Sequence, residues 1–180
     1  VPPGTLPAHD VVAIEKRLRD VTRTWRDDLH TALLERCGEE RGSRLSRRYG
    51  DAFKADYREY YSASIAVLDI EKMETLAGVG HISMSLYRRL EAPADELQFK
   101  LFQYKRPISL SEALPMLENM GLTVRAEHPS TIVPAADQPI WMHDFTMVHG
   151  EGNNLELDLI RDIFQDAFAK IWDHQVENDG

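Results

Sequence analysis

The period of the hydrophobic residues changes along this chain, and that change constrains the fold more than any other feature. Within residues 11–57, large apolar side chains recur every three or four residues, which is typical of amphipathic helices. In residues 82–87 and 97–101 they alternate every two residues, which is typical of half-buried strands. We therefore expect a helical front part and an α+β back part, with the boundary within residues 61–80.

The front part is predicted to form an α-helical hairpin. Asp10 is a suitable N-cap for a long first helix that reaches Arg36, and Gly38 fits the position just past its C-terminus. A second helix is expected over residues 43–61. The two apolar stripes comprise Val11, Ile14, Leu18, Val21, Trp25, Leu29 and Leu33, and then Leu45, Tyr49, Phe53 and Tyr57. Because two bare helices bury little surface, we expect at least one stripe to pack on the sheet part or on a second copy, with Trp25 as a central contact.

The back part is predicted to have the order ββαββα, after a short helix over residues 62–76. Strands are expected at 82–87, 97–105, 122–133 and 140–148, and the second helix at 155–171. Ser109 and Glu112 have the spacing of a capping box at the start of the first helix. Pro115 then falls inside that helix, so the helix either begins nearer Ser111 or bends at the proline.

This order predicts the topology. From the second strand onward it is a ferredoxin-like unit that lacks its last strand, and the strand at residues 82–87 would take the empty edge position. We therefore expect a four-stranded antiparallel sheet with two helices on one face. The predicted parts are a helical hairpin region over 1–61, a connecting helix and turn over 62–80, and an α+β domain over 81–180.

The charge balance excludes some partners. The chain has 21 basic and 30 acidic residues, a formal net charge of −9. Residues 1–61 carry a net charge of +1 and residues 62–180 one of −10. This argues against nucleic acid or an anionic membrane as partner. With 43% hydrophobic and 28% charged residues the chain is typical of soluble globular proteins, and no apolar run reaches the length of a membrane span.

The start of the chain bears on its location in the cell, and its single cysteine bears on disulfides and zinc sites. The chain starts at Val1 without a charged-then-apolar leader, so we expect no signal peptide and a cytoplasmic location. A start without Met is expected of an excised fragment, and equally of a processed chain. The single cysteine, Cys37, excludes an internal disulfide and a Cys-rich zinc site.

The residues predict no catalytic, cofactor-binding or metal-binding site. The turn at residues 78–80 has two glycines but lacks the third glycine and the following helix of a dinucleotide fingerprint. Cys37 has no histidine near it in sequence to activate it. His143 and Asp144 are neighbours in a predicted strand, so they should point to opposite faces and not share a metal ion.

One stretch resembles a known regulatory module. Residues 105–124, KRPISLSEALPMLENMGLTV, resemble the first strand, loop, helix and strand of ACT domains, which often bind amino acids at paired interfaces. The resemblance implies an ACT-like fold for residues 81–180 and an amino-acid effector at the loop. Arg106 would bind the carboxylate, and backbone groups around Ser109 and Ser111 would add donors at the helix N-terminus. ACT domains commonly have glycine where this chain has Ile108.

A second resemblance covers nearly the whole chain. Its motifs are TWRDDL at 24–29, RYGDAF at 48–53 with Tyr57, LPMLENMGL at 114–122 with Val124, Glu127 and Pro129, WMHDF at 141–145, FAKIW at 168–172 and ENDG at 177–180. In their order and spacing these resemble a segment N-terminal to the catalytic domain of the large bacterial NAD-dependent glutamate dehydrogenases.

The second resemblance implies a regulatory or assembly role in a longer enzyme. That enzyme would oxidatively deaminate L-glutamate to 2-oxoglutarate and ammonium with NAD, while this segment alone would hold no cofactor and be inactive. The implied partners are the rest of the parent chain, including its catalytic domain, and further copies in a homo-oligomer. The alternatives are an independent amino-acid-binding ACT-type sensor and a pure oligomerisation scaffold.

Overall fold

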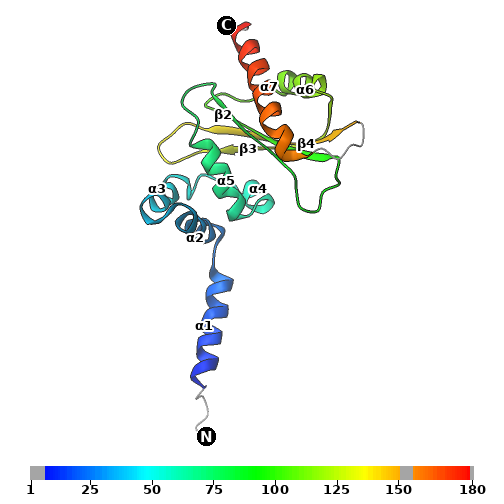
Figure 1. Ribbon diagram of the computed structural model, residues 1–180. Coiled ribbons are helices and arrows are strands. Elements are labelled where there is room, and N and C mark those ends of the chain that lie inside the picture. The colour runs from blue at the N-terminus through cyan, green and yellow to red at the C-terminus, as the bar shows by residue number, and fades with distance from the viewer. Residues whose placement is uncertain (1–6, 151–155, 179–180) are drawn as a thin grey trace.

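The computed structural model describes residues 7–150 and 156–178, and it places a four-stranded sheet between two layers of helices (Figure 1). The elements are α1 Ala8–Thr22, α2 Trp25–Cys37, α3 Glu39–Tyr49, α4 Ala55–Tyr60, α5 Ala63–Met73, β1 Ile82–Tyr87, β2 Glu96–Tyr104, α6 Leu110–Asn119, β3 Leu122–Ile132, β4 Ile140–His149 and α7 Leu157–Asn178. No helix in these two ranges is long and apolar enough to cross a membrane.

The sheet has the predicted topology. Its strand order is β1-β2-β4-β3, and every neighbouring pair is antiparallel. The edge strand β1 pairs with β2, so that Met84 lies opposite Leu101. The ββαββα order and the use of β1 to complete a ferredoxin-like sheet are thus confirmed.

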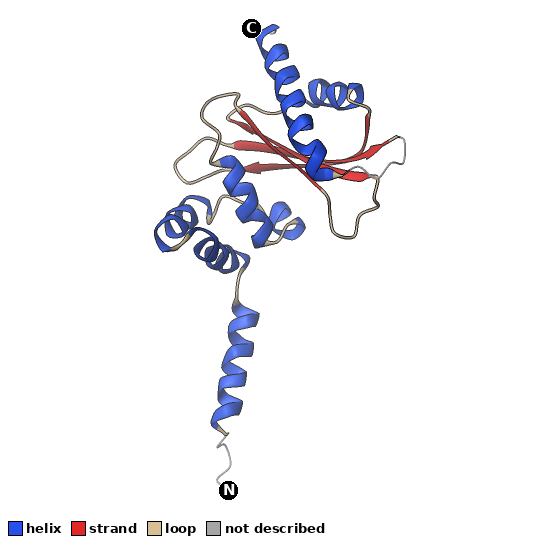
Figure 2. Ribbon diagram, viewed as in Figure 1, coloured by secondary structure: helices blue, strands red, loops and turns tan. Residues whose placement is uncertain are grey.

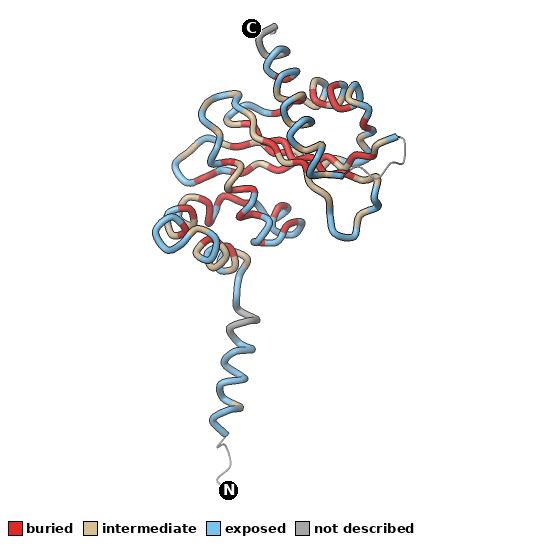
Figure 3. The backbone as a smooth tube through the Cα atoms, viewed as in Figure 1, coloured by how far each residue is buried: buried red, intermediate tan, exposed pale blue. Residues whose placement is uncertain are grey.

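Helices cover both faces of the sheet. Helices α6 and α7 lie on one face, and the front helices lie on the other (Figure 2). Along β2, Phe99 and Leu101 belong to the core with α7, whereas Phe102 belongs to the core with the front helices. The interior of β2 is consequently buried on both sides (Figure 3). Of the two expectations for the apolar stripes, packing on the sheet is the one that the structure shows.

The expected single helix over residues 10–36 is wrong. It is interrupted at Arg23 and Thr24, and a new helix, α2, begins at Trp25. The Thr24 hydroxyl accepts a hydrogen bond from the Asp27 N–H at 3.2 Å, and the Asp27 carboxylate accepts one from the Thr24 N–H at 3.0 Å. This capping box satisfies N–H groups that would otherwise lack partners at the start of α2. The apolar stripe therefore divides, and α1 extends away from the sheet with Leu18 exposed (Figure 1).

The expected helix over residues 43–61 is also two helices. Helix α3 ends at Tyr49, and α4 begins at Ala55. Between them Phe53 forms an isolated antiparallel bridge with Ile132, and the Val133 N–H donates to the Ala52 carbonyl at 3.1 Å. The interruption thus lets the backbone of the helical layer bond to the end of β3.

Helix α5 belongs to the same core as α2, α3 and α4. It packs against α2 and β1, and it buries six of its residues. The segment 62–80 therefore does more than connect two parts, because its helix fills the space between the front helices and the sheet. The division of the chain at residues 1–61, 62–80 and 81–180 stays a prediction.

Helix α6 continues through Pro115. Ser109 is the N-cap residue, but its side chain makes no capping hydrogen bond within the described residues, so the predicted capping box does not form. The helix begins at Leu110 and contains Pro115. Gly121 follows with φ of +84°, a left-handed conformation that favours glycine.

Candidate functional site

A cluster of ionisable side chains lies buried between the sheet and the front helices. Lys100 is 2% exposed, Asp144 2% and Asp69 3%. Lys100 alternates with Phe99 and Leu101 on β2, so it points toward the helical layer. Asp144 is its neighbour on β4 in the strand register, and Asp69 comes from α5. We call these residues, with Tyr57, Tyr61 and Tyr87, the buried polar cluster.

The Lys100 ammonium is the centre of the buried polar cluster. Its Nζ lies 3.0 Å and 2.9 Å from the two carboxylate oxygens of Asp69. The same Nζ lies 4.2 Å from the ring centroid of Tyr61 and 5.3 Å from that of Tyr87. Aromatic faces attract cations, so the two rings add to the attraction of the carboxylate.

Three tyrosine hydroxyls complete the buried polar cluster. Tyr57 donates to Asp69 Oδ2 at 2.6 Å. Tyr61 and Tyr87 both donate to Asp144 Oδ2, at 2.6 Å and 2.7 Å. Oδ1 of Asp144 is buried and has no hydrogen-bond partner among residues 7–150 and 156–178. The hydroxyls come from α4, the residue after it, and β1, so the cluster ties several elements together.

Burial controls the ionisation of this cluster. It raises the pKa of Tyr57, Tyr61 and Tyr87 well above the ordinary value, and the nearby carboxylates raise these pKa values further. Burial also raises the pKa of Asp69, although the Lys100 ammonium and the Tyr57 hydroxyl act in the opposite direction. The phenols are therefore held as neutral donors to the carboxylates.

The arrangement is suited to positioning and not to reaction with a substrate. The lysine and both carboxylates are enclosed by strands on one side and helices on the other. Removing one partner of a buried ion pair leaves an uncompensated charge, which costs about 3–5 kcal/mol. The cluster therefore holds the helical layer in one orientation on the sheet. Within the described ranges no group of three or more His, Cys, Asp or Glu is placed to hold a metal ion.

The predicted effector residues lie together in the loop between β2 and α6. Arg106 is exposed, and Ser109 Oγ lies 2.9 Å from Ser111 Oγ. Lys105 has φ of +67° and donates its N–H to the Pro139 carbonyl at 2.8 Å. Ile108 is 6% exposed and packs in the core with α7, so its side chain points away from the solvent side of the loop.

The sequence analysis missed the buried polar cluster but placed a nearby pair correctly. His143 pairs with Glu127, while Asp144 accepts from Tyr61 in the opposite layer, so the prediction of opposite faces is confirmed. The sequence carried no clear signal for the cluster, because Lys100 between Phe99 and Leu101 is the ordinary alternation of a half-buried strand, whose polar face normally meets solvent.

Comparison with known proteins gives a family match for the front helices and another for the α+β part. Residues 32–76 match the family described as glutamate dehydrogenase, helical motif 2, and residues 81–160 match glutamate dehydrogenase, ACT3 domain. The chain is 40% identical to the NAD-specific glutamate dehydrogenase of Halomonas elongata over 95% of its length, and 32% identical to that of Pseudomonas aeruginosa over 94%. The chain belongs to the NAD-specific glutamate dehydrogenase family.

A more distant NAD-specific glutamate dehydrogenase, from Mycobacterium tuberculosis, is 26% identical over 99% of the chain. The chain spans only 10–11% of the length of these three glutamate dehydrogenases. Both resemblances inferred from the sequence, to ACT domains and to this family, are confirmed. Asp69 lies in the helical motif and Lys100 in the ACT3 domain, so their ion pair joins the two matched segments.

Proposed function

We propose that this chain is a non-catalytic regulatory and assembly segment of an NAD-dependent glutamate dehydrogenase. The parent enzyme would oxidise L-glutamate to 2-oxoglutarate and ammonium, with the hydride passing to NAD, on a catalytic domain outside these residues. The proposal includes a cytoplasmic location, because the reaction draws on the cell's NAD pool. The observation that carries it is the buried polar cluster, which joins an ACT domain to a helical motif.

The buried polar cluster supports a mechanical role for the segment. Sliding or tilting of the helical layer would separate Asp69 from Lys100 and leave charges buried without partners, at a cost of about 3–5 kcal/mol. The two layers should therefore move as one body. A rigid body of this kind transmits a displacement at one surface to another surface without deforming between them.

The loop between β2 and α6 is the proposed point of control. Its effector would be an amino acid, whose carboxylate the exposed Arg106 guanidinium would bind in a bidentate manner. Backbone N–H groups near Ser109 and Ser111, at the N-terminus of α6, would add donors. The buried Ile108 leaves the outer side of the loop open. Strand β2 carries both Lys100 and the start of this loop, so a shift of the loop would reach the buried polar cluster.

Two assays test the proposal. In the first, the 180-residue chain receives glutamate and NAD, and NADH absorbance is followed. We expect no turnover, since the catalytic domain lies elsewhere. Turnover above background by the pure chain would refute the assignment as a non-catalytic segment.

In the second assay, the full-length parent enzyme carries Arg106→Ala, with Arg125→Ala as a matched control at another exposed arginine. Rates are measured across a panel of amino acids. We expect the Arg106 variant alone to lose an amino-acid response, while its rate without effector stays unchanged. Equal responses of both variants and the parent would exclude the loop as the regulatory site.

A further inference from the structure

The outer face of α3 carries three exposed arginines. Arg41, Arg44 and Arg47 are exposed and follow one another at three-residue spacing. In the part of the chain that the structure describes, none of them forms an ion pair or a hydrogen bond. The next arginine, Arg48, differs, because it pairs with Glu74 at 3.2 Å and with Asp137 at 2.7 Å. We call the first three residues the arginine face.

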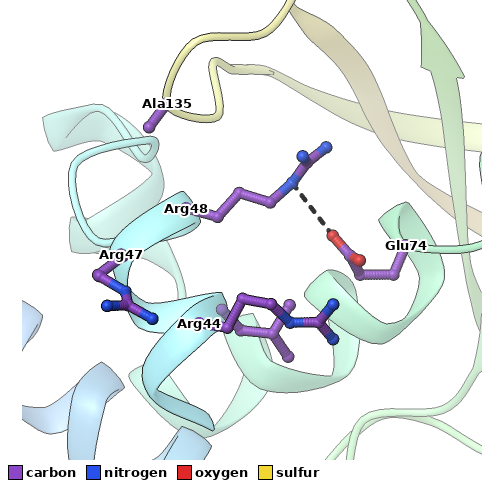
Figure 4. A pocket seen from close by; sticks show the side chains of 6 residues that line it. Arg44, Arg47, Arg48, Glu74 and Ala135 are labelled. Atoms are coloured by element: carbon purple, nitrogen blue, oxygen red, sulfur yellow. Dashed lines mark ion pairs between the residues drawn. The ribbon is translucent and has the colours of Figure 1, made fainter. Parts of the chain in front are cut away.

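Two hollows flank the arginine face. One has a volume of about 400 Å³ and is lined by Arg44, Arg47, Arg48 and Glu74, among others. The other, of about 580 Å³, is lined by Cys37, Gly38, the carboxylates of Glu39 and Glu40, and all three arginines. Figure 4 shows the first hollow, where the one ion pair drawn is that of Arg48 with Glu74. Arg44 and Arg47 thus form a cationic ridge between two hollows.

Helix α7 presents a face of complementary character. Its inner side places Phe168 and Trp172 in the core, but Leu159 is 68% exposed and Ile163 71% exposed. Asp158, Asp162 and Asp166 are exposed on the same outer region of the helix, and Asp158 is paired with Arg161 of its own helix at 3.2 Å. We call these five outer residues the acidic face of α7.

We propose that the arginine face of one copy docks the acidic face of α7 in a second copy. Helices α3 and α7 lie on opposite faces of the sheet, so the two faces cannot meet within one copy (Figure 1). The resulting contact joins different surfaces of two copies, head to tail. This inference rests on the assembly part of the proposed function and names its surfaces.

The dimensions and chemistry of the two faces match. At 1.5 Å rise per residue, the three arginines span about 9 Å and the three aspartates about 12 Å along their helices, a difference that the long arginine side chains can bridge. Leu159 and Ile163 stand among the carboxylates and would enter the hollows beside Arg44 and Arg47. Arginine is favoured in such contacts because its planar fork binds carboxylates.

The contact should be weak and sensitive to salt. Ion pairs at an exposed surface contribute little individually and are screened within about 8 Å at physiological ionic strength. Two apolar side chains add a small buried area. In a larger enzyme that holds several copies together, the raised effective concentration would strengthen the same contact further.

Sedimentation velocity of the 180-residue chain at low and high salt tests the contact. We expect concentration-dependent association at low salt that high salt reverses. Arg44→Glu with Arg47→Glu, or separately Asp162→Arg with Asp166→Arg, should weaken it at least about tenfold, because like charges then face each other. The matched control for the arginine variant, Arg17→Glu with Arg125→Glu, lowers the net charge by the same amount at other exposed positions and should leave association unchanged.

The decisive sample is an equimolar mixture of the two charge-reversed variants. In the mixture the unchanged arginine face of one variant meets the unchanged acidic face of the other, and the two reversed faces also attract each other. The mixture should therefore associate at concentrations where each variant alone stays monomeric. Thermal melting confirms that all variants are folded. A wild-type chain that stays monomeric at low salt, a control variant that loses association equally, or a mixture that stays monomeric would each overturn the proposal. The NADH assay above is unaffected by these outcomes, so the two ideas fail separately.

Discussion

The two faces of the sheet are buried by different chemistry. On the side of α6 and α7 the core is made of apolar side chains such as Phe99, Leu101 and Phe168. On the side of the front helices, apolar packing surrounds Lys100, Asp69 and their tyrosine partners. Apolar surfaces pack without a strongly preferred direction, whereas a buried ion pair is satisfied in one geometry only. The comparison suggests that α6 and α7 supply stability, and that the front helices are additionally fixed in orientation.

The largest effect should come from breaking the buried polar cluster. Lys100→Met leaves the buried Asp69 carboxylate without its cation, so we expect the free energy of unfolding to fall by about 3–5 kcal/mol. Urea denaturation measures it. The double variant with Met at 100 and Asp69→Leu removes a charge from each side and should recover more than half of the loss. A double variant as unstable as the single one would show that the ion pair does not set the cost.

A large effect is also expected at Trp25. Its indole N–H donates to the Tyr61 carbonyl at 3.0 Å, and its ring packs edge-on against Phe53 and Tyr57. Trp25→Ala should therefore cost about 3 kcal/mol, the lower end for a truncated aromatic, because the side chain is only partly buried. These contacts lie within one copy, so the sedimentation coefficient should not change. An unchanged melting temperature would show that the ring contributes no packing.

The tyrosines should make the front side sensitive to alkali. Since the pKa values of Tyr57, Tyr61 and Tyr87 are raised in the folded state, the unfolded chain loses these protons above about pH 10 while the folded chain keeps them. Stability must then fall as pH rises, by about 1.4 kcal/mol per pH unit for each tyrosine. Denaturation at several alkaline pH values gives this slope. Tyr87→Phe should reduce the slope of unfolding free energy against pH by the contribution of one proton. An unaltered slope would show that Tyr87 does not contribute to the alkaline loss of stability.

The smallest effect is expected on the apolar side. Met147 is fully buried in the core with α7, and Met147→Leu nearly conserves its volume. We expect a loss of about 1 kcal/mol or less, with an unchanged dependence on urea. A loss as large as that of Lys100→Met would mean that packing on the α7 side tolerates change no better than the buried ion pair does, which would contradict the difference between the two faces of the sheet.

The sheet could be predicted because its signal is local. Alternation along β1 and β2, and the single helix between β2 and β3, leave few ways to order the strands. The polar interior could not be predicted in the same way. Alternation shows that Gln98 and Lys100 share a face, but a shared polar face normally meets solvent, and nothing local indicates that helices from an earlier part of the chain will cover it.

The prediction of one continuous helix through Thr24 fails for a different reason. Thr24 followed three residues later by Asp27 is a capping signal that stood in the sequence, but the continuous apolar stripe outweighed it. For the loop between β2 and α6, its place between a strand and a helix could be predicted. The inward orientation of Ile108 could not, because it depends on packing with residues distant in sequence. The ligand of Arg106, Ser109 and Ser111 stays a prediction.

The edges of the sheet have a consequence for growth by strand addition. At the β3 edge, Pro129 lacks the N–H that an added strand would bond, and the register shifts between Val124 and Ala126. At the β1 edge, the Gln165 side chain accepts from the Leu86 N–H at 3.2 Å, and Arg161 donates to the Leu86 carbonyl at 3.1 Å. Both edges are thus blunted, so this fold should resist polymerising through its strands, and neighbours must approach it through its helices.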